Sequence, residues 1–118
     1  MAQRVPLDKE TEATLTRHLE AIMSRDVEAV LDNFTEESVI ITADGVIRGL
    51  SAIRADTEFF FSESPEGLID AIEVVRQEVI GEIAYIIWKA EPYVSMASET
   101  FLVRDGKIRV QTYVSQEG

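Results

Sequence analysis

The fold is decided by residues 17–62, which read RHLEAIMSRDVEAVLDNFTEESVIITADGVIRGLSAIRADTEFFFS. This stretch predicts two short helices, a strand, a turn and a third helix, in that order. Ser38–Ala43 is rich in β-branched residues and therefore suits a strand, and the Asp44-Gly45 pair that follows suits a turn. Asp26 is expected to cap the second helix and Ser51 the third.

The first two helices each have an apolar face that is expected to point inward. Leu15, Leu19 and Ile22 recur at three- to four-residue spacing, so they form one stripe along the first helix. The second helix is shorter, and its expected inward side chains are Val27, Val30, Leu31 and Phe34.

Four long β-type runs follow a loop at residues 62–67. They are Ile69–Ile80, Ile83–Glu91, Tyr93–Arg104 and Lys107–Ser115. This order of elements predicts helices wrapped by one curved sheet around a pocket. Both faces of the run Ala84–Trp88 are apolar, so that strand should be buried on both sides. Helices can cover only one face in a domain of this size, and we therefore expect a second subunit on the other.

Length and composition predict one domain over residues 1–118. The chain is 46% hydrophobic and 28% charged, and no apolar run approaches the roughly 20 residues of a membrane-spanning helix. The net charge of −11 argues against nucleic-acid partners and anionic membranes, which need clustered lysine and arginine. The absence of cysteine argues against disulfides and thiolate metal sites, and a cytoplasmic location is expected.

The layout and three short segments resemble the nuclear transport factor 2-like superfamily, which includes SnoaL-like polyketide cyclases and ketosteroid isomerases. The segments are Ser24–Val30, Gly49–Arg54, and Gly106–Ile108 together with Tyr113, and the resemblance covers roughly residues 8–116. It implies a cone-shaped, cystatin-like α+β roll of order α-α-β-α-β-β-β-β. Helices would pack on the concave face of a curved, mainly antiparallel sheet, which usually forms a homodimer. The scaffold hosts isomerases, cyclases, dehydratases, hydrolases and binding modules, so fold alone does not settle function.

Comparison with ketosteroid isomerase suggests which residues would reach the pocket. That enzyme uses an aspartate base and an oxyanion hole made of a tyrosine and a protonated aspartate. The resemblance places His18 at the tyrosine position, Glu99 at the protonated acid and Thr42 at the base. Because a threonine cannot act as a base near neutral pH, steroid isomerisation by that mechanism is not expected.

His18 and Glu99 are nevertheless the candidate catalytic residues. His18 falls on or beside the apolar stripe of its helix, where it is either a general base or oxyanion donor, or a core histidine bonded to backbone or water. Glu99 shares a strand face with Phe101. If that face points inward, its carboxyl would have a raised pKa and stay protonated; if it points outward, Glu99 is simply solvated.

Six further residues are expected to line the pocket. They are Thr42, Phe60, Trp88, Phe101, Thr112 and Val114. For Trp88 and Phe60, core packing is the alternative. Tyr113 alternates with Thr112 and Val114, and the resemblance places it on the dimer side. One histidine and no cysteine argue against a transition-metal site, and no cofactor is expected.

The sequence thus predicts binding of a small apolar or carbonyl-containing ligand, with isomerase-, cyclase- or dehydratase-like acid–base chemistry. His18 would move a proton and Glu99 would stabilise an enolate-like oxygen. The alternative is a non-catalytic ligand-binding or dimerisation module, with a pocket filled by Trp88 and the phenylalanines. A protein-transport or scaffolding role would need an exposed apolar patch that the sequence cannot display.

Overall fold

The computed structural model describes residues 6–117. Along this range the elements are α1 (Leu7–Met23), α2 (Val27–Leu31), β1 (Phe34–Thr42), β2 (Gly45–Arg48), α3 (Gly49–Glu63), the 3-10 helix η1 (Ile69–Ala71), β3 (Glu73–Ile80), β4 (Ile83–Ala90), β5 (Val94–Arg104) and β6 (Lys107–Glu117).

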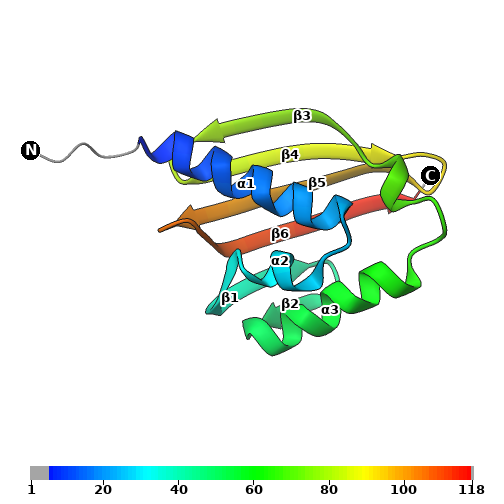
Figure 1. Ribbon diagram of the computed structural model, residues 1–118. Coiled ribbons are helices and arrows are strands. Elements are labelled where there is room, and N and C mark those ends of the chain that lie inside the picture. Colours follow the sequence, from blue (N-terminus) through cyan, green and yellow to red (C-terminus); the bar gives the residue numbers. More distant parts are fainter. Residues whose placement is uncertain (1–5, 118) are drawn as a thin grey trace, which may run out of the picture.

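The strands form one sheet in the order β2-β1-β6-β5-β4-β3. Only the β1–β6 pair is parallel among the strands described, and the other neighbours are antiparallel. Figure 1 shows all three helices on one side of the sheet, with α1 along β4 and β5 and with α3 near β1 and β2. The predicted α+β architecture, with helices on one face of a mainly antiparallel sheet, is confirmed.

Three element boundaries differ from the sequence-based expectation. Phe34 begins β1 instead of ending α2, because the carbonyl of Asn33 accepts the N–H of Ile108 at 2.7 Å and draws the chain to β6. The Asp44-Gly45 turn leads into an additional strand, β2, which is only four residues long. Residues 69–71 form a 3-10 turn, so β3 begins four residues later than predicted.

The two predicted helix caps have different outcomes. Asp26 caps α2 as predicted, since its Oδ1 accepts the N–H of Ala29 at 3.1 Å. The prediction of Ser51 as the cap of α3 is wrong. The helix begins at Gly49, whose φ of +83° lets the chain turn directly out of β2, and Arg48 precedes it without a side-chain cap.

An extra residue in β6 reverses the alternation of its side chains. Ile108 pairs with Val103 of β5, but the preceding residue of β5, Leu102, pairs with Val110, so Arg109 is left between them. Such a bulge places two residues of one strand opposite one residue of the other. Beyond it, the side chains on the helix side belong to odd-numbered residues instead of even-numbered ones.

The core lies between the helices and the inner face of the sheet. Its fully buried side chains include Leu15, Ile53, Ile86, Phe101 and Ile108. The prediction for β4 holds on the inner face, where Ala84, Ile86 and Trp88 are buried. On the outer face Tyr85 and Ile87 are half-buried in the single chain. No helix within residues 6–117 is long and apolar enough to cross a membrane.

Candidate functional site

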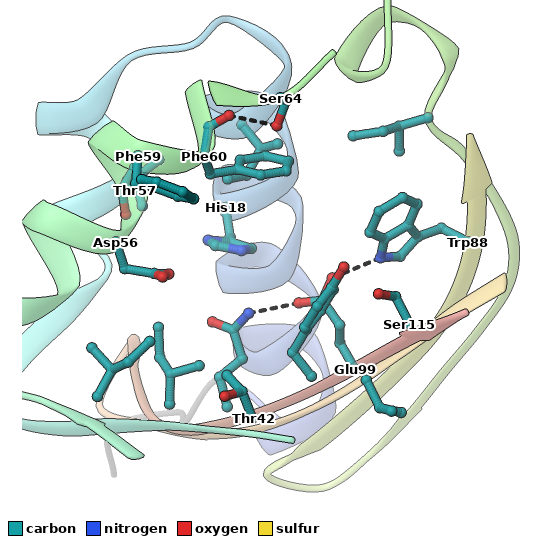
Figure 2. A pocket seen from close by; sticks show the side chains of 18 of the residues that line it. His18, Thr42, Asp56, Thr57, Phe59, Phe60, Ser64, Trp88, Glu99 and Ser115 are labelled. Atoms are coloured by element: carbon teal, nitrogen blue, oxygen red, sulfur yellow. Dashed lines mark hydrogen bonds between the residues drawn. The ribbon is translucent and has the colours of Figure 1, made fainter. Parts of the chain in front are cut away.

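A cavity of about 820 Å³ opens between the helices and the inner face of the sheet. Its size is within the range of pockets that hold small molecules. Figure 2 shows His18, Asp56 and Phe60 reaching it from the helices and Trp88 and Glu99 from the sheet. Its apolar lining includes Leu19, Ile22, Val30, Phe34, Ile40, Ile47, Phe59, Phe60, Ile72 and Trp88.

Strand register brings the polar side chains of the sheet together. One cross-strand row runs from Thr42 of β1 through Tyr113 of β6 to Glu99 of β5. The neighbouring row contains Gln111, which pairs with Phe101. Thr42, Tyr113, Glu99 and Gln111 all line the cavity, so residues distant in sequence form one polar region on an otherwise apolar wall.

Glu99 is the central group of this region. Its Oε2 accepts the indole N–H of Trp88 at 2.7 Å, and its Oε1 accepts an amide N–H of Gln111 at 2.6 Å (Figure 2). These bonds favour the carboxylate, but burial disfavours it more strongly and raises the pKa of Glu99 to about 7. The carboxyl group therefore titrates near neutral pH.

His18 is held in an aromatic setting on α1. The imidazole is 5% exposed, and the rings of Phe34 and Phe101 meet it edge to face at 5.8 and 5.5 Å between centroids. Burial lowers the pKa of His18 to about 4, so the ring is neutral at pH 7. Its Nδ1 is buried without a hydrogen-bond partner among the described residues.

Gln111 and Tyr113 complete the polar region on β6. Gln111 is 7% exposed, and its Oε1 is buried with no hydrogen-bond partner within residues 6–117. The Tyr113 ring lies 6.3 Å from that of Trp88, tilted by 31°. Burial raises the pKa of Tyr113, and the nearby charges of Glu99 and Asp56 add to the effect, so the phenol stays protonated.

Asp56 faces the cavity from α3. Burial raises the pKa of its carboxyl as well. Asp44 of the β1–β2 turn and Glu63 at the end of α3 also line the cavity, and both are exposed. Arg54 of α3 lies outside the lining and donates to both carboxylate oxygens of Glu28 at 2.6 and 3.0 Å.

The residues singled out from the sequence fall into two groups. His18, Thr42, Phe60, Trp88, Glu99 and Val114 line the cavity, whereas Phe101 and Thr112 do not. Phe101 does point inward, but it is fully buried beneath the His18 ring. Thr112 is on the outer face, where its Oγ1 accepts the N–H of Thr100 at 3.2 Å.

The placement of Tyr113 on the dimer side is wrong. The resemblance turned Thr112 and Val114 inward, as simple alternation from the buried Ile108 would, but the extra residue at Arg109 shifts the inward set to Gln111, Tyr113 and Ser115. Val114 reaches the lining only as a half-exposed side chain, 54% exposed.

The sequence analysis missed two polar residues of the site, Gln111 and Asp56. Gln111 could not be found without the bulge. Asp56 had a usable signal, since it lies three and four residues before Phe59 and Phe60 and so shares their helix face. Among residues 6–117, no three side chains of the types that bind metals come together.

The arrangement offers a neutral imidazole, a carboxyl group that titrates near pH 7, and a free amide oxygen inside an apolar cavity. No protein-family model and no curated protein matches this sequence. Solved structures do match its fold.

An NTF2-like protein of unknown function from Mesorhizobium loti superposes with a TM-score of 0.79 and 18% identity over 97% of each chain. A proposed ketosteroid isomerase from Kribbella flavida gives a TM-score of 0.75 and 15% identity, covering 96% of this chain and 82% of that one. A proposed SnoaL-like polyketide cyclase from Jannaschia gives 0.72 and 14%, covering 98% and 92%. At these identities the likeness shows the fold alone, and it confirms the nuclear transport factor 2-like fold that the sequence predicted.

Proposed function

We propose that this chain, which has the nuclear transport factor 2-like fold, binds a small and largely apolar molecule and exchanges a proton with it through Glu99. The main support for this proposal is the Glu99 carboxyl group, which is hydrogen-bonded to Trp88 and Gln111 and faces the cavity with a pKa of about 7. General acid–base catalysis is most effective when the pKa of the catalytic group is near the ambient pH.

The proton transfer has a simple form for a carbonyl compound. The Glu99 carboxylate takes a proton from the carbon next to the carbonyl, the C–H electron pair forms a C=C bond, and the carbonyl oxygen becomes an enolate. The proton on Glu99 then returns to carbon at the same or another position. This assigns the base to Glu99 instead of His18, because an imidazole with a pKa of about 4 is a weak base at pH 7. His18 would bind the polar group of the ligand.

Hydrogen exchange on a simple ketone tests this chemistry without knowledge of the natural substrate. The probe is 2-tetralone, an apolar ketone with acidic C–H bonds, and deuterium incorporation from D₂O is followed by NMR. We expect the enzyme-dependent exchange rate to fall by about 10²-fold or more in Glu99→Gln.

Glu37→Gln is the matched control, because it makes the same chemical change at an exposed carboxylate outside the cavity. If 2-tetralone binds without catalysed exchange, the chain is a ligand-binding module and the catalytic part of the proposal is wrong. The open cavity already favours ligand binding over a module whose pocket is filled by its own side chains.

We also propose that a second copy of the chain covers the outer face of the sheet. This face carries the half-buried Tyr85 and Ile87 of β4, and Ile83 of β4 and Ile41 of β1 on the same face are 41% and 43% exposed. Exposed apolar side chains gathered on one sheet face are typical of an interface. The arrangement leaves the cavity, on the opposite face, free for ligand.

A further inference from the structure

The cavity carries several acidic side chains, and the one histidine in its lining is neutral at pH 7. Asp44, Asp56 and Glu63 lie at its exposed part and Glu99 lies inside, whereas no lysine or arginine among residues 6–117 contributes to the lining. Charges of one sign around a cleft with apolar walls raise the local concentration of ligands of the opposite sign. The cavity should therefore attract cations and repel carboxylates and phosphates.

Two hydrogen-bond donors inside the cavity are already used, whereas one buried acceptor is free. The indole N–H of Trp88 and one amide N–H of Gln111 are both donated to Glu99. Gln111 Oε1, in a side chain that is 93% buried, has no donor within the described residues. Buried polar atoms in folded proteins nearly always have a partner, so this oxygen indicates a missing N–H or O–H donor.

The orientation of the Gln111 amide follows from its neighbour. An ionised Glu99 is an acceptor only, so the amide nitrogen must face it and the amide oxygen must face away. The free acceptor is thus next to the carboxylate that the same side chain binds. A ligand group with several N–H bonds can satisfy both at once.

The walls beside these acceptors suit a cation with an apolar body. Trp88 and Tyr113 present adjacent rings, and Phe59 and Phe60 line the cavity from α3. The faces of aromatic rings attract ammonium groups, most strongly for tryptophan.

We infer that the cavity also binds an apolar amine as a cation, with its N–H groups donating to Glu99 and Gln111 and its apolar part against Trp88 and the phenylalanines. This inference rests on the proposed use of the cavity as a ligand site. It names a second class of ligand, for which Glu99 is a hydrogen-bond acceptor and not the base of the exchange reaction. Asp56 adds attraction from the side of α3.

Three probes that differ mainly in charge test this selection. They are 1-naphthylmethylamine, a cation at pH 7.5, 1-naphthalenemethanol, which is neutral, and 1-naphthoate, an anion. Dissociation constants are measured by calorimetry in 0.3 M salt, where attraction to the general negative surface is screened. We expect the amine to bind at least tenfold tighter than the alcohol and the carboxylate to bind more weakly than either.

Variants of three acidic residues then show which side chains cause the preference for the amine over the alcohol. In Glu99→Gln the amine and the alcohol should bind within about threefold of each other, and Asp56→Asn should reduce the preference in part. Glu58→Gln is the control, because Glu58 is exposed on the same helix but does not line the cavity. It should keep the full preference. Asp56 is exposed on α3, so Asp56→Asn is expected to leave the fold intact.

The outcomes separate this inference from the proposed function. If the alcohol or the carboxylate binds as tightly as the amine, the amine assignment is wrong, but the cavity remains a ligand site. If none of the three probes binds, the amine assignment is wrong, and the proposed function is decided separately by the binding and hydrogen exchange of 2-tetralone. A preference for the amine that persists in Glu99→Gln and Asp56→Asn would also overturn the assignment, because the cation would then be recognised elsewhere.

Discussion

Trp88 donates its indole N–H to Oε2 of Glu99 across 2.7 Å, and it is the single tryptophan of the chain. The only indole thus contacts the carboxyl group of Glu99, which is the proposed base of the proton exchange. Its fluorescence therefore reports on the ionisation of one carboxyl group, without any label.

The first prediction concerns this signal. Trp88 emission should change with pH along a single titration curve with a midpoint near pH 7, because the indole bonds to a carboxylate above that pH and to a carboxylic acid below it. In Glu99→Gln the transition should disappear, while Glu37→Gln should retain it. A curve that persists in Glu99→Gln would assign the titration to another group.

The second prediction concerns the bond itself. Trp88→Phe removes the N–H that favours the ionised form, so the pKa of Glu99 should rise above about 7. A hydrogen bond to a charged group contributes about 1.5–3 kcal/mol, so we expect an increase of roughly one pKa unit or more. Carbon-13 NMR of labelled glutamate carboxyls measures it, and an unchanged or lower pKa would contradict the assigned bond.

The third prediction is that Glu99 makes the fold less stable as the pH rises. Its pKa is raised from 4.5 to about 7, so between these pH values the unfolded chain has lost the proton that the folded chain still binds. The free energy of unfolding therefore falls across this window, by at most about 3 kcal/mol, and is level above it. Denaturation of wild type and Glu99→Gln at several pH values measures how the free energy of unfolding changes with pH in each. The part of this change that is due to Glu99 should be absent below pH 4.5.

His18 has the opposite effect on stability. Its pKa is lowered from 6.5 to about 4, so the unfolded chain binds a proton that the folded chain excludes. Stability due to His18 is complete above pH 6.5 and is lost as the pH falls towards 4. The two slopes oppose each other between pH 4.5 and 6.5, so His18→Leu should reveal the falling Glu99 profile and Glu99→Gln the rising His18 profile. Parallel profiles in both variants would contradict the assignments.

The fourth prediction concerns Ser38, which joins β1 to β6 where their register shifts. Its buried Oγ donates to the carbonyl of Ile108 at 2.6 Å and accepts the N–H of Thr35 at 2.8 Å. Ser38→Ala leaves both backbone groups without this partner and should lower the free energy of unfolding by about 1–3 kcal/mol. Urea denaturation measures it, with the exposed Ser95→Ala expected to stay within about 0.5 kcal/mol of wild type.

The fifth prediction tests the proposed homodimer. Wild type should be a dimer by light scattering, and Ile87→Glu, on the outer face of β4, should give a folded monomer. Leu7→Glu makes the same kind of change at a 56% exposed residue of α1 and should remain dimeric. A wild-type monomer at micromolar concentration, or a dimeric Ile87→Glu, would remove the second copy from this face.

Local patterns were sufficient for the helices and most strands. The stripe through Leu15 and Leu19 and the cap at Asp26 depend on residues within a few positions of one another, and such signals are readable from sequence. The strand at Gly45–Arg48 was missed because it is short and forms only by pairing with β1.

The site was less predictable because it depends on register between strands. The family resemblance placed His18 and Glu99 in the pocket, whereas strand and helix faces left a core histidine and a solvated glutamate open. Their pKa values follow from burial, which only the assembled fold determines. Gln111 was missed since its contact with Glu99 exists only after the bulge has shifted β6 by one residue.

That bulge also decides which deletions the cavity wall can tolerate. Loss of Arg109 alone would restore simple alternation along β6 and keep Val110 opposite Leu102, so Gln111 and Tyr113 would still face the cavity. Loss of one residue just beyond the bulge, with the bulge kept, would instead move each later side chain to the opposite face and put Thr112 in the place of Gln111. Two in-frame deletions at neighbouring positions thus have opposite consequences, since one preserves the chemistry of the wall and the other exchanges it on the same scaffold.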